Sequence, residues 1–104
     1  MEGNMTKQEH LTEGFQFFAQ HKYEEAEACF RAALKLDDRF EAAYSALSET
    51  LNRKGDIDGA IPLVRKWIEI NKHDPLAHTA LSRLYVQKGM IEEAEKEMAI
   101  SNFL

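Results

Sequence analysis

The sequence is short of cysteine, of long apolar runs and of positive charge. Its one cysteine, Cys29, has no partner for an intramolecular disulfide, which favours a reducing, cytoplasmic setting. No apolar run approaches the roughly 20 residues that span a membrane, and the N-terminus lacks the charged and apolar regions of a signal peptide. The formal net charge of −5 argues against a basic surface. We therefore expect no nucleic-acid partner and no membrane partner.

Motifs of catalysis and cofactor binding are also missing. The sequence has no glycine-rich phosphate loop, no serine-centred elbow and no histidine pair at the i, i+4 spacing of a helical zinc site. His73, Asp74 and His78 form the one cluster that suggests a metal site, but Asp74 is expected to cap a helix instead. We predict no metal and no cofactor.

Cys29 is the remaining candidate nucleophile. It lies in an acidic stretch close to Glu25 and Glu27, whose carboxylates would raise the pKa of its thiol. A catalytic cysteine needs the opposite shift, because the thiolate is the reactive form. We therefore predict that the chain is not an enzyme.

What the sequence does contain is a regular helical pattern. With 44% hydrophobic and 30% charged residues, the 104-residue chain has the composition of one soluble globular domain. Apolar residues at spacings of three and four predict helices at about 7–20, 24–36, 41–54, 57–71, 75–88 and 91–104. No stretch alternates with period two, so the fold class is all-α, and residues 1–6 are expected to be flexible.

Three helix starts carry capping signals. Thr6 followed by Glu9 matches the capping box, in which a hydroxyl and a carboxylate each satisfy a backbone amide. Asp56 offers a carboxylate to the helix that follows Gly55, and Asp74 precedes Pro75, a residue favoured at the first helical position. These signals place the boundaries between successive helices.

One turn recurs along the chain. In Lys54-Gly55-Asp56-Ile57-Asp58-Gly59-Ala60, a helix ends and another begins, because glycine tolerates the left-handed conformation just past a helix end. The pattern returns from Lys88 to Ala94, and it stands at the same distance before, from Gln20 to Ala26. The chain is therefore expected to be a repeat protein.

Aligned at this constant step, three copies occupy residues 7–40, 41–74 and 75–104. They share small residues in the first helix (Gly14, Ser48, Ser82), the turn (His21, Gly55, Gly89), small residues in the second helix (Ala26, Ala60, Ala94) and bulky ones after them (Phe30, Val64, Met98). This step and order resemble the tetratricopeptide repeat, a helix–turn–helix unit of about 34 residues. The resemblance covers residues 7 to about 102.

The resemblance implies a right-handed α-solenoid of three repeats and six helices. The first helices would line a concave groove that binds a peptide or helix of a partner protein, so we expect a non-catalytic interaction module. Carried onto this sequence, the groove positions are Gln8, Leu11, Phe15 and Phe18 in the first copy, Ser45, Glu49, Asn52 and Arg53 in the second, and Thr79, Arg83, Val86 and Gln87 in the third.

Two of the departures from the repeat bear on its geometry. His21 stands where the other copies have the turn glycine, which puts the geometry of that helix end in question. Trp67 replaces the small residue that Ala33 supplies in the first copy. We expect Trp67 to push a neighbour outward or to show an edge to solvent.

One subclass of the family grips a C-terminal carboxylate of heat-shock chaperones with lysines, asparagines and an arginine. The matching positions here are Leu11, Phe15, Ala46, Leu76 and Ala80. None of these side chains donates a hydrogen bond, so a chaperone carboxylate clamp is not expected. Arg53 and Arg83 remain as cations for an acidic ligand, or as solvated residues paired with Glu49.

The apolar residues of the first helix admit two interpretations. Leu11, Phe15 and Phe18 share one helix face, so they either fill the core or offer an apolar groove to a partner's anchor residue. Phe17 stands at the position that the family buries. We therefore expect at least one of the other aromatics to be partly exposed.

The C-terminal helix supplies an alternative function. Met98, Ile100, Phe103 and Leu104 leave apolar side chains where repeat arrays normally have a polar capping helix. They favour self-association, as in an assembly or scaffold module forming a homo-oligomer, or a chain that is a fragment of a longer array. The remaining alternative is that Phe103 and Leu104 fold back onto the helix at 57–71.

Overall fold

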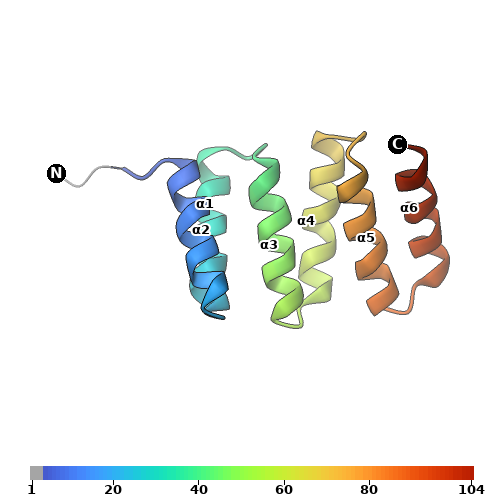
Figure 1. Cartoon of the computed structure of the whole chain (residues 1–104), viewed down its shortest axis with the longest axis horizontal. Coiled ribbons are helices and arrows are strands. Elements are labelled where there is room, and N and C mark those ends of the chain that lie inside the picture. The colour runs from blue at the N-terminus through green and yellow to red at the C-terminus, as the bar shows by residue number, and fades with distance from the viewer. Residues whose placement is uncertain (1–3) are drawn as a thin grey trace.

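The computed structural model describes residues 4–104, which form six helices and contain no strand (Figure 1). The helices are α1 (Lys7–Ala19), α2 (Tyr23–Leu36), α3 (Glu41–Arg53), α4 (Ile57–Ile70), α5 (Pro75–Gln87) and α6 (Ile91–Phe103). Every end falls within one residue of its predicted place, and the all-α prediction is confirmed.

The helices pack as antiparallel pairs that follow one another in a row (Figure 1). Within pairs, α1 packs on α2, α3 on α4 and α5 on α6, while α2 packs on α3 and α4 on α5 to join the pairs. The array measures 52 × 26 × 18 Å and is an α-solenoid of helix–turn–helix units. The exact repeat boundaries stay a prediction, and residues 1–3 of the predicted flexible N-terminus lie outside the described part.

The predicted caps form. The Thr6 hydroxyl accepts a hydrogen bond from the Glu9 amide at 3.1 Å, and the Glu9 carboxylate accepts one from the Thr6 amide at 2.7 Å. Asp56 accepts from the Gly59 amide and Asp74 from the Leu76 amide, both at 2.9 Å. These bonds satisfy amides that the first turn of a helix leaves without a partner.

The three turns share one backbone conformation. Gly55 and Gly89 have φ of 85° and 79°, and His21 reaches the same left-handed region with φ of 61°. The amide after each of them donates to a carbonyl five residues earlier at 2.8–2.9 Å, which closes the helix end. The turn at His21, whose geometry the missing glycine put in question, therefore has the same backbone conformation as the turns at Gly55 and Gly89.

The core lies between the two layers of helices. Ala26, Ala60 and Ala94 are almost fully buried at the repeated small position, and Phe30 fills the space beside Gly14. Trp67 is only 6% exposed, and its indole nitrogen donates to a Glu41 carboxylate oxygen at 3.1 Å. At this exposure the alternative in which Trp67 shows an edge to solvent is wrong, and α3 begins with the acceptor that satisfies its buried N–H. The other alternative, in which Trp67 pushes a neighbour outward, stays a prediction.

Candidate functional site

A hollow runs along the face formed by the first helices of the pairs, α1, α3 and α5. Its N-terminal end has a volume of about 350 Å³. The lining residues are Phe15, Phe18, Ala42, Ser45, Ala46 and Glu49. Because ligand pockets typically measure roughly 300–1,000 Å³, this end suits one or two apolar side chains of a partner rather than a large cofactor.

The aromatic wall of this end is fixed by packing from behind. The Phe15 ring meets the buried Phe30 ring edge-to-face with centroids 5.3 Å apart, and Phe18 meets Tyr23 at the same distance. Edge-to-face pairs at this separation are favourable beyond the area they bury. The wall is therefore ordered before any partner arrives.

The two interpretations of the apolar face of α1 divide between its residues. Leu11 and Phe18 are partly buried and pack against the core, as does Phe17. Phe15 is 49% exposed and faces the hollow. The expectation that one aromatic would be partly exposed is confirmed.

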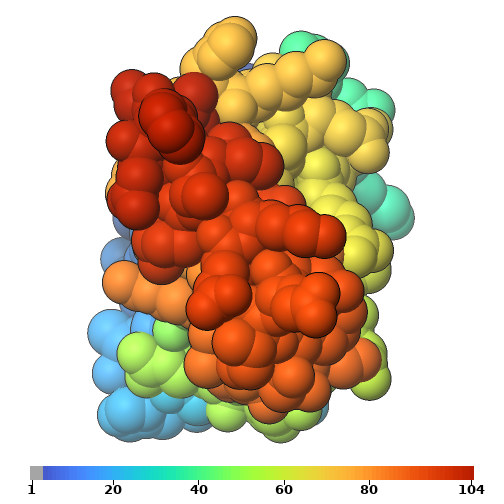
Figure 2. All heavy atoms as spheres, turned by 90° about the vertical axis from the view of Figure 1, so that its right-hand side faces the viewer, coloured from blue at the N-terminus to red at the C-terminus, as the bar shows by residue number. Residues whose placement is uncertain are grey.

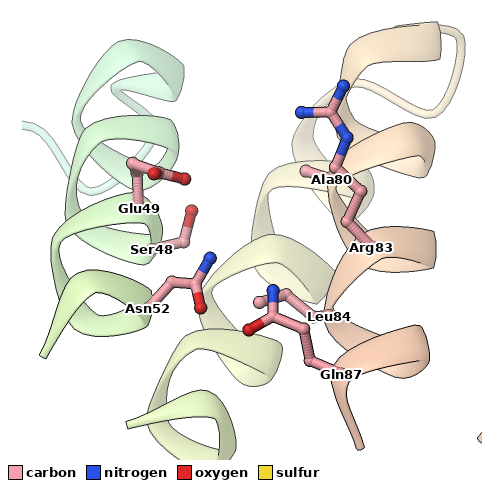
Figure 3. A pocket seen from close by; sticks show the side chains of 7 residues that line it. All are labelled: Ser48, Glu49, Asn52, Ala80, Arg83, Leu84 and Gln87. Atoms are coloured by element: carbon pink, nitrogen blue, oxygen red, sulfur yellow. The ribbon is translucent and has the colours of Figure 1, made fainter. Parts of the chain in front are cut away.

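The C-terminal end of the hollow is polar. Ser48, Glu49 and Asn52 of α3 face Ala80, Arg83, Leu84 and Gln87 of α5, and the Asn52 and Gln87 amides point toward one another (Figure 3). Glu49 lines both ends, so the apolar and polar parts are continuous. This end offers amide donors and acceptors at adjustable positions.

The two arginines predicted for the groove have different surroundings. Arg53 donates to a Glu49 oxygen at 2.9 Å, and its guanidinium lies 5.4 Å from the Phe18 ring centroid. Arg83 is exposed and forms no ion pair with any described residue. Arg53 is thus engaged within the chain, while Arg83 presents a charge to the hollow.

The structure brings together most of the predicted groove residues. Lining the hollow are Phe15, Phe18, Ser45, Glu49, Asn52, Thr79, Arg83 and Gln87. Thr79 also shares a hydrogen bond with the Ser101 hydroxyl at 2.8 Å. Gln8 instead lies on a shallow surface of α1, and Val86, 54% exposed, does not line the hollow.

The sequence did not predict all the residues that line the hollow. Ser48 and Trp67 line the hollow, and neither is among the predicted groove positions. The repeat alignment places Ser48 only at a helix-packing position. Trp67 could have been found from the sequence, because it replaces a small residue of the repeat. Its large side chain reaches from α4 toward the face formed by α1, α3 and α5.

The surroundings of Cys29 differ from those predicted. Cys29 is buried, and its thiol donates to a Glu13 carboxylate oxygen at 3.4 Å. Burial first, and then this hydrogen bond, raise the pKa of the thiol to about 11. The predicted direction is confirmed, but the predicted cause is wrong, because the contributing carboxylate comes from α1 and not from Glu25 or Glu27.

The histidine cluster is used for structure. Asp74 caps α5, as predicted, and His78 is buried with one ring nitrogen 2.8 Å from a Glu97 oxygen and the other 3.0 Å from the Lys72 carbonyl. Across residues 4–104, no group of three or more His, Cys, Asp or Glu side chains is placed to hold a metal ion. In the same residues, no helix combines the length and apolar character required to cross a bilayer.

A family model described as "Tetratricopeptide repeat" matches residues 17–79 and 51–100, which together extend over residues 17–100. The chain belongs to the tetratricopeptide repeat family. No curated protein matches the sequence.

Solved structures with the same fold show how this tetratricopeptide repeat chain compares with others. The crystal structure of MamA superposes with a TM-score of 0.89 at 23% identity over 92% of this chain and 56% of MamA. The second TPR of Spaghetti (RPAP3), bound to the HSP90 peptide SRMEEVD, gives 0.88 at 16% identity over 96% and 93%. The Yersinia enterocolitica secretion translocator chaperone SycD gives 0.88 at 22% identity over 95% and 75%. This chain spans little more than half the length of MamA.

Proposed function

We propose that this tetratricopeptide repeat chain is a non-catalytic interaction module that binds a peptide or helix of a partner protein in the hollow of α1, α3 and α5. The observation that carries the proposal is the half-exposed Phe15 on an apolar wall that continues to Arg83, which has no ion-pair partner among residues 4–104. The structures of similar fold include one with a bound peptide, which supports the class of partner.

Apolar anchoring supplies the affinity in this proposal. An aliphatic or aromatic side chain of the partner lies against Phe15 and Phe18, over the small side chains of Ala42 and Ala46. Burying such a side chain contributes about 1.5–3 kcal/mol, before the cost of ordering the partner. Because the edge-to-face pairs already fix the wall, little further side-chain ordering is needed in this chain.

Polar selection acts at the other end of the hollow. A carboxylate of the partner pairs with Arg83, and the Asn52 and Gln87 amides bond to its backbone or to polar side chains. The partner therefore carries an apolar residue followed, further along the hollow, by an acidic one.

The mode differs from that of a carboxylate clamp. The peptide in the Spaghetti structure comes from HSP90. At the corresponding clamp positions this chain has Leu11, Phe15, Ala46, Leu76 and Ala80, whose side chains have no donor for an anion. We propose that binding uses an internal apolar and acidic segment, and that a C-terminal carboxylate is not required.

The test is capture of partners from source lysate by the native chain and by two variants. Phe15→Ala and Arg83→Ala are each expected to weaken binding of the captured partner about fivefold or more, since truncating a central anchor commonly costs over about 1 kcal/mol. The matched controls are Leu36→Ala and Arg39→Ala, which alter an exposed leucine and an exposed arginine away from the hollow. Equal capture by all five chains would reject the proposal.

Self-association is the second candidate, and the observation that favours it is the exposed end of α6. Phe103 is 90% exposed, with Leu104 at 49% and Ile100 at 42%. The alternative in which Phe103 and Leu104 fold back onto α4 is wrong, because such contacts would bury them. Met98 lies apart from these three on the α6 surface, since it is two residues from Ile100 on a helix.

A further inference from the structure

The outward-facing edge of α6 has nearly the same pattern of residues as the edge of α2 against which the next repeat packs. The residues that correspond between α2, α4 and α6 at the repeat step are Tyr23, Ile57 and Ile91, then Glu24, Asp58 and Glu92, then Glu27, Ile61 and Glu95, then Phe30, Val64 and Met98. The first and last of these positions are apolar in every copy. The two between them are acidic in both α2 and α6.

In the first and second copies, on α2 and α4, acidic residues at these positions pair with a lysine of the following repeat. The Lys54 ammonium lies 2.7 Å from Glu27 and 3.0 Å from Glu24, and it comes from the carboxyl end of α3, which packs on α2. Lys88, at the corresponding end of α5, pairs with Asp58 of α4. The same ion pair thus joins each repeat to the next, beside an apolar contact.

The third copy of this surface has no partner within the described chain. Glu92 and Glu95 are exposed and form no ion pair with any residue of 4–104. Met98 is 37% exposed, whereas Phe30 and Val64 at the corresponding positions are fully buried. Figure 2 shows α6 across the end face of the molecule with no other element in front of it.

The N-terminal helix of a second copy does not fit this surface. The residues of α1 that correspond to the docked faces of α3 and α5 include Glu9 and Glu13, and Gln20 replaces the lysine. Stacking α1 of one copy on α6 of another would bring these carboxylates toward Glu92 and Glu95. Like charges at an interface oppose association, so the electrostatics disfavour that occupant.

We infer that the Ile91, Glu92, Glu95 and Met98 edge of α6 is a docking site for a helix of a partner protein that ends in a lysine. The partner helix carries small and aliphatic residues on one face, as α3 and α5 do, and places its terminal ammonium between Glu92 and Glu95. This site is at the end of the solenoid and is separate from the proposed peptide hollow.

The probe for the site is a fluorescent peptide of residues 40–56, which contains α3 and Lys54. We expect saturable binding to the full chain by fluorescence anisotropy, weakened about threefold to tenfold by Lys54→Glu in the peptide or by Glu92→Lys with Glu95→Lys in the chain. Combining the reversed peptide with the reversed chain is expected to restore binding. Circular dichroism checks that the reversed chain folds, as expected for changes at exposed positions.

A second test attaches the peptide covalently to the chain, which reduces the entropic cost of ordering it. The free peptide is only marginally helical alone. Residues 37–56 fused after Leu104 continue the repeat at the same step, and we expect the melting temperature to rise by about 5 °C, with a smaller rise when the appended lysine is glutamate. No rise in the fusion and no binding of the peptide would overturn the inference.

Two further outcomes would also overturn it. If Phe15→Ala abolished peptide binding while the Glu92→Lys and Glu95→Lys chain bound normally, the peptide would occupy the hollow, which supports the proposed function instead. If light scattering showed that the native chain forms dimers and that Glu95→Lys dissociates them, the occupant would be a second copy.

Discussion

Gly14 shows how a single residue sets the distance between α1 and α2. A Cβ at this position would clash with the Phe30 ring, and Phe30 is fully buried, so its ring has little room to move. In the sequence, Gly14 stands out as one of the small residues that the three copies share. That pattern did not indicate which side chain fills the space.

We predict that Gly14→Ala lowers the free energy of unfolding by about 1–2 kcal/mol. Overpacking typically costs about 1–3 kcal/mol, and the better helix propensity of alanine offsets up to about 1 kcal/mol of it. Urea denaturation followed by circular dichroism measures the change. In the double variant Gly14→Ala with Phe30→Leu, the two losses are expected to be less than additive, because the smaller side chain leaves room for the methyl group. Strict additivity would contradict the packing account.

Cys29 gives a second prediction at the scale of one residue. Because burial and Glu13 raise the pKa of the thiol to about 11, only about one thiol in a thousand is ionised at pH 8. We expect a thiol reagent to react on the order of 100-fold more slowly than with free cysteine. Glu13→Gln removes the smaller contribution and should accelerate the reaction only modestly. A fast reaction in the native chain would show that Cys29 is accessible and ionised.

At the scale of the element, the helices follow from local signals, and their contacts follow from the repeat. The apolar periodicity, the capping residues and the turn positions together placed every helix end within one residue, since these signals act over a few neighbouring residues. The ion pairs between Lys54 and Glu27 and between Lys88 and Asp58 join residues on successive repeats, far apart along the chain. No local pattern predicts them, and they emerged only with the packing of α2 on α3 and α4 on α5.

The Lys54 ion pair makes the stability of this contact depend on pH. The hydrogen bond from Lys54 holds the pKa of the Glu27 carboxyl below its ordinary value of 4.5, with Arg31 adding to the effect. A pKa lowered by folding contributes stability above the unfolded value and loses it as the pH falls through the folded value. The loss therefore occurs in acid, below about pH 4.5.

We predict that Glu27→Gln reduces stability at pH 7 and flattens its decline between about pH 5 and pH 3. Urea denaturation over this range measures both effects. Other carboxylates, including Asp37 paired with Lys7, keep part of the decline. The control is Glu25→Gln on the same helix, since Glu25 forms no ion pair with the described residues. An unchanged acid slope in Glu27→Gln would contradict the assignment.

At the scale of the whole molecule, the row of repeats leaves two distinct surfaces. The hollow runs along the first helices. The exposed edge of α6 lies at the C-terminal end of the row (Figures 1 and 2). Each surface exists because a repeat array is extended and buries each unit only against its neighbours. The exposed apolar residues at the end of α6 form a separate patch, which is the candidate surface for self-association.

For self-association, we expect the mass measured by light scattering to rise with concentration for the native chain. Phe103→Ser with Leu104→Ser should give a monomer, because it removes the most exposed apolar side chains of this patch. The control is Leu36→Ser, which alters an exposed leucine on α2 and should leave the mass unchanged. Equal monomeric masses for the native chain and the double variant would end this candidate.

The six helices, their ends and the constant step between the copies could be read from the sequence, because helix periodicity, capping and turn chemistry are local and three copies repeat them in phase. Which side chains face outward became clear only when the helices were packed against one another. Phe15 is half exposed in the hollow while Phe17 packs against the core, and Trp67 is buried with a bond to Glu41. Arg53 is paired with Glu49, whereas Arg83 forms no ion pair with the described residues. The physical reason is that burial and pairing depend on what lies across a helix contact, and the neighbours along the chain do not specify it.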